Sequence, residues 1–181
     1  EMSSRGLGDV YKRQQQRFIR LLQTLPLAQP LDVIAAEEVT NAVRDWLDED
    51  PSGLEVERLP GGAEALYYAE LTPPYRPANR PFVSVSELRL VRGVSAELYR
   101  ALLPHISVWG EAININTASA ALLRSLNKNG VLLPLSEAQV APWLGNQQRD
   151  KSAYASVNEA LAAANVEQID SAGLAVNSRF F

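Results

Sequence analysis

The stretch EAININTASAALLRSL, residues 111–126, contains both of the local patterns from which this chain is built. In its first half, Ile113 and Ile115 face one side of an extended segment, and the asparagines that follow each of them face the other. Asn116 or Thr117 is then placed to cap a helix, because either side chain can accept a hydrogen bond from a free helix N–H group. The apolar face of that helix is formed by Ala118, Leu122, Leu123 and Leu126. A short extended segment followed by a short capped helix predicts a mainly α fold with short strand segments.

Two further segments begin with a helix-starting motif. FVSVSELRLVRGV contains Ser84-x-x-Glu87, and YASVNEALAAANV contains Ser156-x-x-Glu159. In this capping box the serine oxygen accepts a hydrogen bond from a helix N–H group, and the glutamate accepts one from the N–H group of the serine itself. Each motif therefore predicts the first turn of a short helix. We interpret both serines as structural, because the sequence places no base beside either of them.

The helical pattern extends along most of the chain. Residues 15–25 and the segment from Asp32 to Pro51 carry apolar residues at helical spacing. PLSEAQVAPWL predicts another short helix, interrupted near Pro142, because proline lacks the backbone N–H group that a helix interior needs. The segment LAVNSRFF, residues 174–181, alternates apolar and polar residues and predicts a strand.

These elements suggest a division of the chain. Residues 1–14 show no helical or strand period, and DVYKRQ resembles a translated adapter sequence, so we expect a non-native or disordered leader. Residues 15–172 are predicted to form an α-rich domain. LTPPYRPANRPF has four prolines in twelve residues, so a subdivision is expected near residues 72–82. Residues 173–181 would begin a separate strand.

Composition limits the class of protein. The chain has 181 residues, of which 46% are hydrophobic, enough for a packed core. Its mild acidity, with a pI near 5.1, argues against a dedicated nucleic-acid binder. It has no cysteine, which excludes disulfides and thiolate metal sites. No apolar run approaches the roughly 18 residues of a membrane span.

An acidic segment, residues 45–64, carries seven acidic residues and one arginine where a helix is expected to end. Carboxylates at a helix C-terminus oppose the helix dipole. A bound Ca²⁺ ion would compensate, because Ca²⁺ binds about six to eight oxygen ligands. The candidate ligands are Asp45, Asp48, Asp50 and Glu64. The segment does not match the EF-hand pattern, and a solvated acidic turn is the alternative that the residues alone leave open.

Three stretches in one order carry a family resemblance: DWLDED followed by GGAEALYY, then PPYRPANRPFVSVSELRLVRGV, then ININTASAALLRSL. Together they resemble the minor pseudopilins of the type II secretion system known as general secretion pathway protein K. The similarity runs from about Gln15 to Phe181. It implies a pilin-like α+β protein with a large multi-helix domain inserted into it, and a C-terminal strand that re-enters the pilin sheet.

The resemblance also implies a function. Such a protein would lie at the tip of the periplasmic pseudopilus of a Gram-negative bacterium, anchored in the inner membrane by a helix that this chain lacks. Its implied partners are the minor pseudopilins GspI and GspJ, with GspH as a further candidate, and its role is to support export of folded proteins across the outer membrane. The family likeness also implies calcium in this domain, with Asp45, Asp48, Asp50 and Glu64 as the candidate ligands.

Two other function classes were considered. ININTA followed by a leucine-rich helix also resembles the entry to a helix-hairpin-helix module, which binds nucleic-acid phosphates through the N–H groups of a glycine-rich hairpin. Here the next turn, NKNGVLLP, has one glycine and one lysine, so nucleic-acid binding is the alternative function. The sequence has no phosphate loop, nucleophile elbow or metal-binding histidine pair, so we expect no enzymatic activity.

Overall fold

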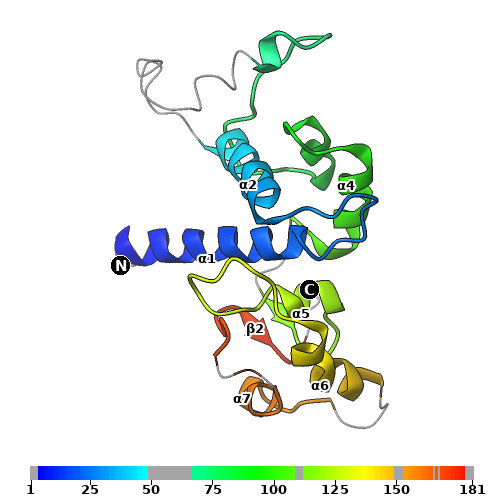
Figure 1. Ribbon diagram of the computed structural model, residues 1–181. Helices are drawn as coiled ribbons and strands as arrows, with labels where there is room; N and C mark the ends of the chain where they lie inside the picture. Colours follow the sequence, from blue (N-terminus) through cyan, green and yellow to red (C-terminus); the bar gives the residue numbers. More distant parts are fainter. Residues whose placement is uncertain are drawn as a thin grey trace. The chain divides into compact units, whose positions relative to one another are not determined.

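A computed structural model describes residues 4–48, 67–108, 112–148, 153–164, 166 and 168–177. Within these ranges the chain is mainly helical, with two short strands, which confirms the predicted fold class. The elements are α1 (Ser4–Leu22), α2 (Val33–Leu47), η1 (Val85–Leu90), α4 (Ala96–Leu102), η2 (Leu103–His105), β1 (Ile113–Asn114), α5 (Ala120–Arg124), α6 (Glu137–Gln148), α7 (Val157–Ala162) and β2 (Leu174–Ala175) (Figure 1).

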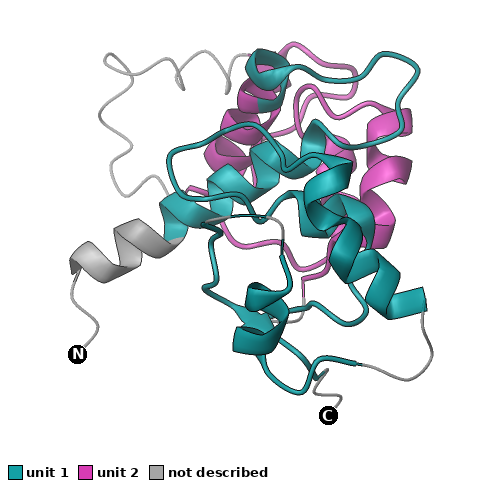
Figure 2. Ribbon diagram, turned by 60° about the horizontal axis from the view of Figure 1, so that its bottom comes forward, with its two compact units in different colours: residues 1–36, 109–181 teal, residues 37–108 magenta. Residues whose placement is uncertain are grey.

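The chain divides into two compact units (Figure 2). Unit 1 contains residues 1–36 and 109–181, and unit 2 contains residues 37–108. The proline-rich segment 72–82, where a subdivision was expected, lies inside unit 2. The physical reason is that this segment packs with the core of unit 2, because partly buried Leu71, Tyr75, Ala78 and Phe82 all contact that core.

Helix α1 begins at Ser4, earlier than the predicted start at Gln15. Residues 4–14 therefore continue the helix, and Leu7, Val10 and Tyr11 stand at helical spacing within them. Lysine, arginine and glutamine have high helix propensity, so Lys12 to Gln15 can extend a helix whose burial lies further along. The buried part of α1 is its last turns, where Ile19, Leu21 and Leu22 belong to the core. The non-native origin of residues 1–14 stays a prediction.

Unit 2 has an aromatic core. Trp46, near the end of α2, is 2% exposed and Tyr68 is fully buried. Their rings meet edge to face at 5.3 Å, and Tyr75 lies 6.1 Å from the Trp46 ring. Edge-to-face pairs are favourable because the positive ring edge meets the negative ring face. Leu88 and Val91 complete this core, so η1 is held against the end of α2.

Unit 1 has an aliphatic core around Trp143, which is fully buried and donates a hydrogen bond from Nε1 to the Ala160 carbonyl at 2.7 Å. The other core members are Ile115, Ala118, Leu123, Leu126, Leu135, Val140 and Ala160. Helix α6 runs through Pro142 without interruption, contrary to the prediction. A proline removes one helix hydrogen bond, and burial of Val140 and Trp143 on either side of it compensates.

The predicted C-terminal strand is present as β2. It pairs in parallel with β1, with Ile113 opposite Leu174. The Ile113 N–H group donates to the Gly173 carbonyl at 2.8 Å, and the Ile115 N–H group donates to the Ala175 carbonyl at 2.9 Å. Within the described residues this two-stranded ladder is the sheet that the C-terminal segment joins.

The predicted helix caps are only partly right. Ser84 and Glu87 form the expected capping box at η1, and the Ser156 side chain accepts the Glu159 N–H group at the start of α7. Helix α5, however, is capped by Ser119 rather than by Asn116 or Thr117.

Asn116 has a different role from the predicted one. Its side-chain amide donates to the carbonyls of Tyr154 and Val176 at 3.1 and 2.9 Å, and its side-chain oxygen accepts the Tyr154 N–H group at 2.9 Å. It therefore joins the turn after β1 to two distant segments, which leaves its side chain unable to cap α5.

Candidate functional sites

Two of the four predicted metal ligands lie in the described structure. Asp45 is in the last turn of α2 and Asp48 follows its last residue. Asp50 and Glu64 lie outside the described residues. In the described part of the chain, no three residues among histidine, cysteine, aspartate and glutamate lie close enough together to hold a metal ion. The convergence of the four predicted ligands therefore stays a prediction.

The end of α2 has fewer free groups than the sequence suggested. Arg44 donates to Oδ1 of Asp45 at 3.1 Å, which leaves Oδ2 of that carboxylate for another partner. The Trp46 carbonyl accepts the Asn79 N–H group at 2.9 Å, and the Arg44 carbonyl accepts the Asp48 N–H group at 2.9 Å. These helix-end carbonyls are already hydrogen-bonded, so carboxylates are the better candidate ligands at this site.

Trp46 adds an unusual feature to the same helix end. Its Nε1–H group is buried and has no hydrogen-bond acceptor among the described residues. A buried donor without a partner is costly, by about 1–3 kcal/mol. The indole is part of the aromatic core of unit 2, and Trp46 follows Asp45 in the last turn of α2, so its environment is sensitive to any rearrangement of this helix end.

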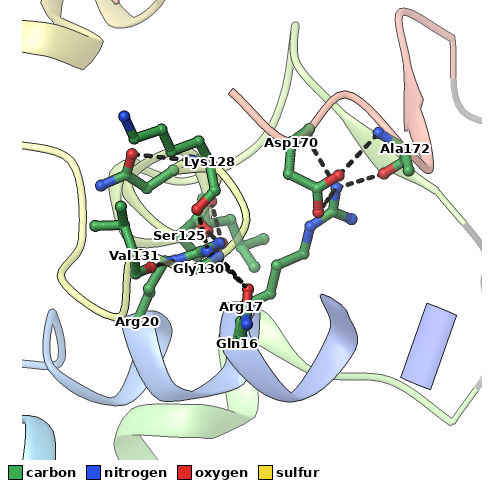
Figure 3. Close-up of polar contacts among 11 residues, drawn as sticks. Gln16, Arg17, Arg20, Ser125, Lys128, Gly130, Val131, Asp170 and Ala172 are labelled. Carbon is green, nitrogen blue, oxygen red and sulfur yellow. Dashed lines mark hydrogen bonds and ion pairs between the residues drawn. The ribbon is translucent and has the colours of Figure 1, made fainter. Parts of the chain in front are cut away.

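A second polar site, in unit 1, was not predicted. We call it the arginine anchor, and it consists of Gln16, Arg17 and Arg20 on α1 (Figure 3). Arg20 is fully buried, and its guanidinium group donates to three backbone carbonyls. The acceptors are Val131 at 2.7 Å, Ser125 at 2.9 Å and Lys128 at 2.8 Å. One side chain of α1 therefore holds the whole turn between α5 and α6.

Arg17 attaches the C-terminal part of unit 1 to the same helix. It forms an ion pair with Asp170 at 2.8 Å, and it donates to the carbonyls of Asp170 and Ala172. Asp170 is 5% exposed. Burial lowers the pKa of Arg17, and the Asp170 carboxylate opposes that shift by favouring the charged guanidinium. The same two causes act on the pKa of Arg20, again with burial as the larger.

Gln16 binds the backbone of the turn that would carry the hairpin of a nucleic-acid-binding module. Its Oε1 accepts the Gly130 N–H group at 3.0 Å, and the Lys128 N–H group is bonded to Asn127 Oδ1 at 2.8 Å. Two amides that a phosphate would need are thus already occupied. Gly130 has a φ of +87°, which favours glycine and shapes the turn for this contact. The structure gives no support to nucleic-acid binding.

The described chain is thus a mainly helical protein of two compact units, in which buried polar side chains bind its own backbone. Two family models cover almost all of it. Both are described as type II secretion system (T2SS), protein K, and they match residues 4–111 and 113–177. The chain belongs to the type II secretion system protein K family.

Individual relatives agree with this assignment. Type II secretion system protein K of Pectobacterium carotovorum subsp. carotovorum is 37% identical over 158 residues, which cover 81% of this chain and 44% of the relative. The Klebsiella pneumoniae protein is 35% identical over 176 residues, which cover 92% of this chain and 49% of the relative. The chain therefore spans about half the length of the curated relatives it matches.

A solved structure has the same fold. It is a chain of the GspK–GspI–GspJ complex from enterotoxigenic Escherichia coli, with a TM-score of 0.60 and 25% sequence identity. The match covers 91% of this chain and 56% of that chain. In the described part of the present chain, no helix is both long and apolar enough to cross a membrane.

Proposed function

We propose that this chain is the α-rich domain of a minor pseudopilin, located at the tip of the periplasmic pseudopilus of a type II secretion system. The observation that carries this proposal is the structural match over 91% of the chain to a protein solved as part of the GspK–GspI–GspJ complex. The partners would be the minor pseudopilins I and J, with H as a further candidate, and the full protein would be anchored in the inner membrane. The role is structural rather than enzymatic.

Genetic complementation tests the secretion role. Deletion of the gene for the full-length protein in its host should leave a secreted protein in the periplasm, and re-expression should restore its export. The domain's own contribution is tested with full-length protein that carries Arg20→Met, because loss of the arginine anchor should impair unit 1 and with it secretion. Unchanged export after deletion of the gene would contradict the proposal.

We also propose that the acidic segment of this domain binds Ca²⁺. In the described structure, Asp45 offers Oδ2 and Asp48 has an exposed carboxylate, which are ligands of the type that Ca²⁺ prefers. Asp50 and Glu64 are the other proposed ligands. The ion would compensate the carboxylates at the end of α2, where they oppose the helix dipole.

The buried indole of Trp46 provides a direct readout for this proposal. In protein with Trp109→Phe and Trp143→Phe, Ca²⁺ titration should change the fluorescence of Trp46, and calorimetry should give a matching affinity. A chelator should lower the melting temperature, because an ion that binds only the folded state stabilises it. Asp45→Asn with Asp48→Asn should remove all three effects, whereas Glu38→Gln, an exposed carboxylate earlier on α2, should keep them.

The contrary results are equally clear. No heat of binding, no change in Trp46 fluorescence and the same melting temperature with and without chelator would show that the acidic segment is a solvated turn. Retention of Ca²⁺ binding by the double asparagine variant would place the ion elsewhere in the chain. The secretion role would be unaffected by either result.

A further inference from the structure

Two arginines of unit 2 are stacked on tyrosine rings at its surface. The guanidinium carbon of Arg92 lies 5.0 Å from the centre of the Tyr67 ring, and that of Arg89 lies 5.7 Å from the centre of the Tyr99 ring. Both distances are within the roughly 6 Å over which a cation is attracted to an aromatic face. Stacking restricts a flexible arginine side chain, so these two charges are held in place.

The two pairs are joined by one short segment. Val91 is 3% exposed and packs in the core of unit 2, whereas Arg89, Leu90 and Arg92 around it are exposed. The Leu90 carbonyl accepts the Tyr75 hydroxyl at 2.9 Å, and the Arg92 N–H group donates to the Tyr68 hydroxyl at 2.9 Å. The aromatic core therefore fixes the backbone that presents these side chains.

We call this surface the arginine–tyrosine patch, and it consists of Tyr67, Arg89, Leu90, Arg92 and Tyr99. Leu90 is 44% exposed and Tyr67 is 37% exposed, so both can contact a partner. Tyrosine and arginine are the residues enriched in the energetically important centres of protein interfaces. A rigid surface of this composition loses little conformational entropy when it binds a partner.

The charge of the patch is not compensated within the described structure. Arg17, Arg44 and Arg80 each form an ion pair with a carboxylate. Among the described residues, neither Arg89 nor Arg92 has such a partner. Two guanidinium groups and an exposed leucine within residues 89–92 are complementary to a segment that carries carboxylates and an aliphatic side chain.

We propose that the arginine–tyrosine patch binds an acidic protein segment, with its carboxylates on Arg89 and Arg92 and an aliphatic side chain against Leu90. The inference adds the chemistry of one contact surface to the proposed function. Its test uses no secretion assay, so either proposal can fail without the other.

Fluorescence anisotropy with defined peptides tests the proposal on the whole chain. The probe is a labelled peptide of sequence Glu-Leu-Glu-Asp-Leu-Glu, and its counterpart Gln-Leu-Gln-Asn-Leu-Gln measures the contribution of charge. We expect the acidic peptide to bind and its affinity to fall as salt rises from about 0.05 M to about 0.5 M, because salt screens exposed charges. The neutral peptide should bind about tenfold more weakly or not at all.

Variants locate the binding to the patch. Arg89→Glu with Arg92→Glu should weaken the acidic peptide by at least about tenfold, because both attractive charges are reversed. If charge reversal unfolds unit 2, Arg89→Gln with Arg92→Gln is a milder change that removes both charges. Circular dichroism checks that each double variant is folded. Lys128→Glu changes an exposed charge in unit 1 and should leave peptide binding unaltered.

Three results would overturn the proposal. The first is equal binding of the acidic and neutral peptides, and the second is an unchanged affinity in folded patch variants. The third is no binding of the acidic peptide up to about 1 mM. A separate experiment measures binding of the chain to phosphatidylglycerol vesicles, and the third result overturns the proposal whether or not the vesicles bind. If the vesicles bind and the patch variants abolish that binding, the surface recognises an anionic membrane instead of a protein.

Discussion

Arg20 shows how a charged residue can occupy the buried side of a helix. The side chain has no exposed surface, yet three backbone carbonyls accept hydrogen bonds from its guanidinium group. Those carbonyls belong to the segment between α5 and α6, where the Lys128 carbonyl also accepts the Val131 N–H group at 3.2 Å. Arginine suits this position because its planar group has five donors in fixed directions.

Replacement of this arginine by an apolar side chain of similar length should destabilise the protein. We expect Arg20→Met to lower the free energy of unfolding by about 3 kcal/mol, because three backbone carbonyls lose their side-chain donor. Urea denaturation followed by circular dichroism measures the change. Arg100→Met, which removes an exposed arginine, should change stability by no more than about 0.5 kcal/mol. A similar small effect for Arg20→Met would mean that water replaces the guanidinium group at no cost.

Sequence patterns alone could not reveal this anchor. A charged residue in an amphipathic helix is normally assigned to the solvent side, and Arg20 makes its contacts with a turn more than a hundred positions away. The acidic site was easier to propose, because its charges lie within one segment of twenty residues. The structure describes Asp45 and Asp48, two of the four proposed ligands. The Ca²⁺ site is therefore a hypothesis from the sequence, and the structure gives the positions of these two ligands.

At the scale of helices and strands, the capping boxes were predicted because their signal is entirely local. Ser84 and Ser156 each have a glutamate three positions later, and both serines start the elements that follow them. Ser119 has Leu122 at that position, so nothing in the local pattern distinguished it from Asn116 or Thr117. The choice depends instead on tertiary contacts, because Asn116 is engaged with two distant segments.

The cap of α5 can be tested with two neighbouring substitutions. Ser119→Ala should lower the free energy of unfolding by about 1 kcal/mol, because the Leu122 N–H group loses its side-chain acceptor. Thr117→Ala should have an effect within about 0.5 kcal/mol, because Thr117 is exposed and does not cap the helix. Urea denaturation of both variants measures the difference. The reverse order of effects would restore Thr117 as the cap.

The capping box of η1 should make stability depend on pH. The Val83 N–H group, with contributions from Ser84 and Arg80, lowers the pKa of Glu87 below its ordinary value of 4.5. A carboxylate with a depressed pKa in the folded state contributes its full stability above the unfolded-state pKa and loses it as pH falls through the folded-state value. Glu87→Gln should therefore be less stable than the native chain at neutral pH, with a difference that shrinks below pH 4.5.

Thermal denaturation over a series of pH values checks this expectation. Glu97→Gln is a suitable control, because it removes a carboxylate from the first turn of a different helix, α4. A stability difference for Glu87→Gln that stays constant from neutral to acidic pH would show that the loss comes from packing rather than from the charged carboxylate.

At the scale of the whole molecule, unit 1 combines the two ends of the chain. Residues 1–36 join residues 109–181, and Arg17 meets Asp170 across 153 positions of sequence. Helix content and short strands were predictable from periodicity, but this pairing of distant segments was not, because it depends on polar contacts to backbone groups. The sequence therefore predicted the elements, whereas the grouping of distant segments into units depends on contacts that periodicity does not report.

Among the described residues, the core of unit 1 contains Trp143 and the core of unit 2 contains Trp46, so the two units can be followed separately. We expect Leu123→Ala, a fully buried position of unit 1, to lower stability by about 3 kcal/mol through the cavity it creates. In single-tryptophan proteins that carry this substitution, the urea midpoint reported by Trp143 fluorescence should shift more than the urea midpoint reported by Trp46 fluorescence. Leu88→Ala in unit 2 should produce the opposite order.

This reciprocal pattern follows because a core substitution first destabilises the unit that contains it. The single-tryptophan proteins carry Trp109→Phe with either Trp46→Phe or Trp143→Phe, and denaturation by urea gives the two midpoints. Equal shifts of both signals for both substitutions would show that the chain unfolds in one cooperative step. In that case the division into units would describe packing alone, and stabilisation at the end of α2 by Ca²⁺ would protect unit 1 as well as unit 2.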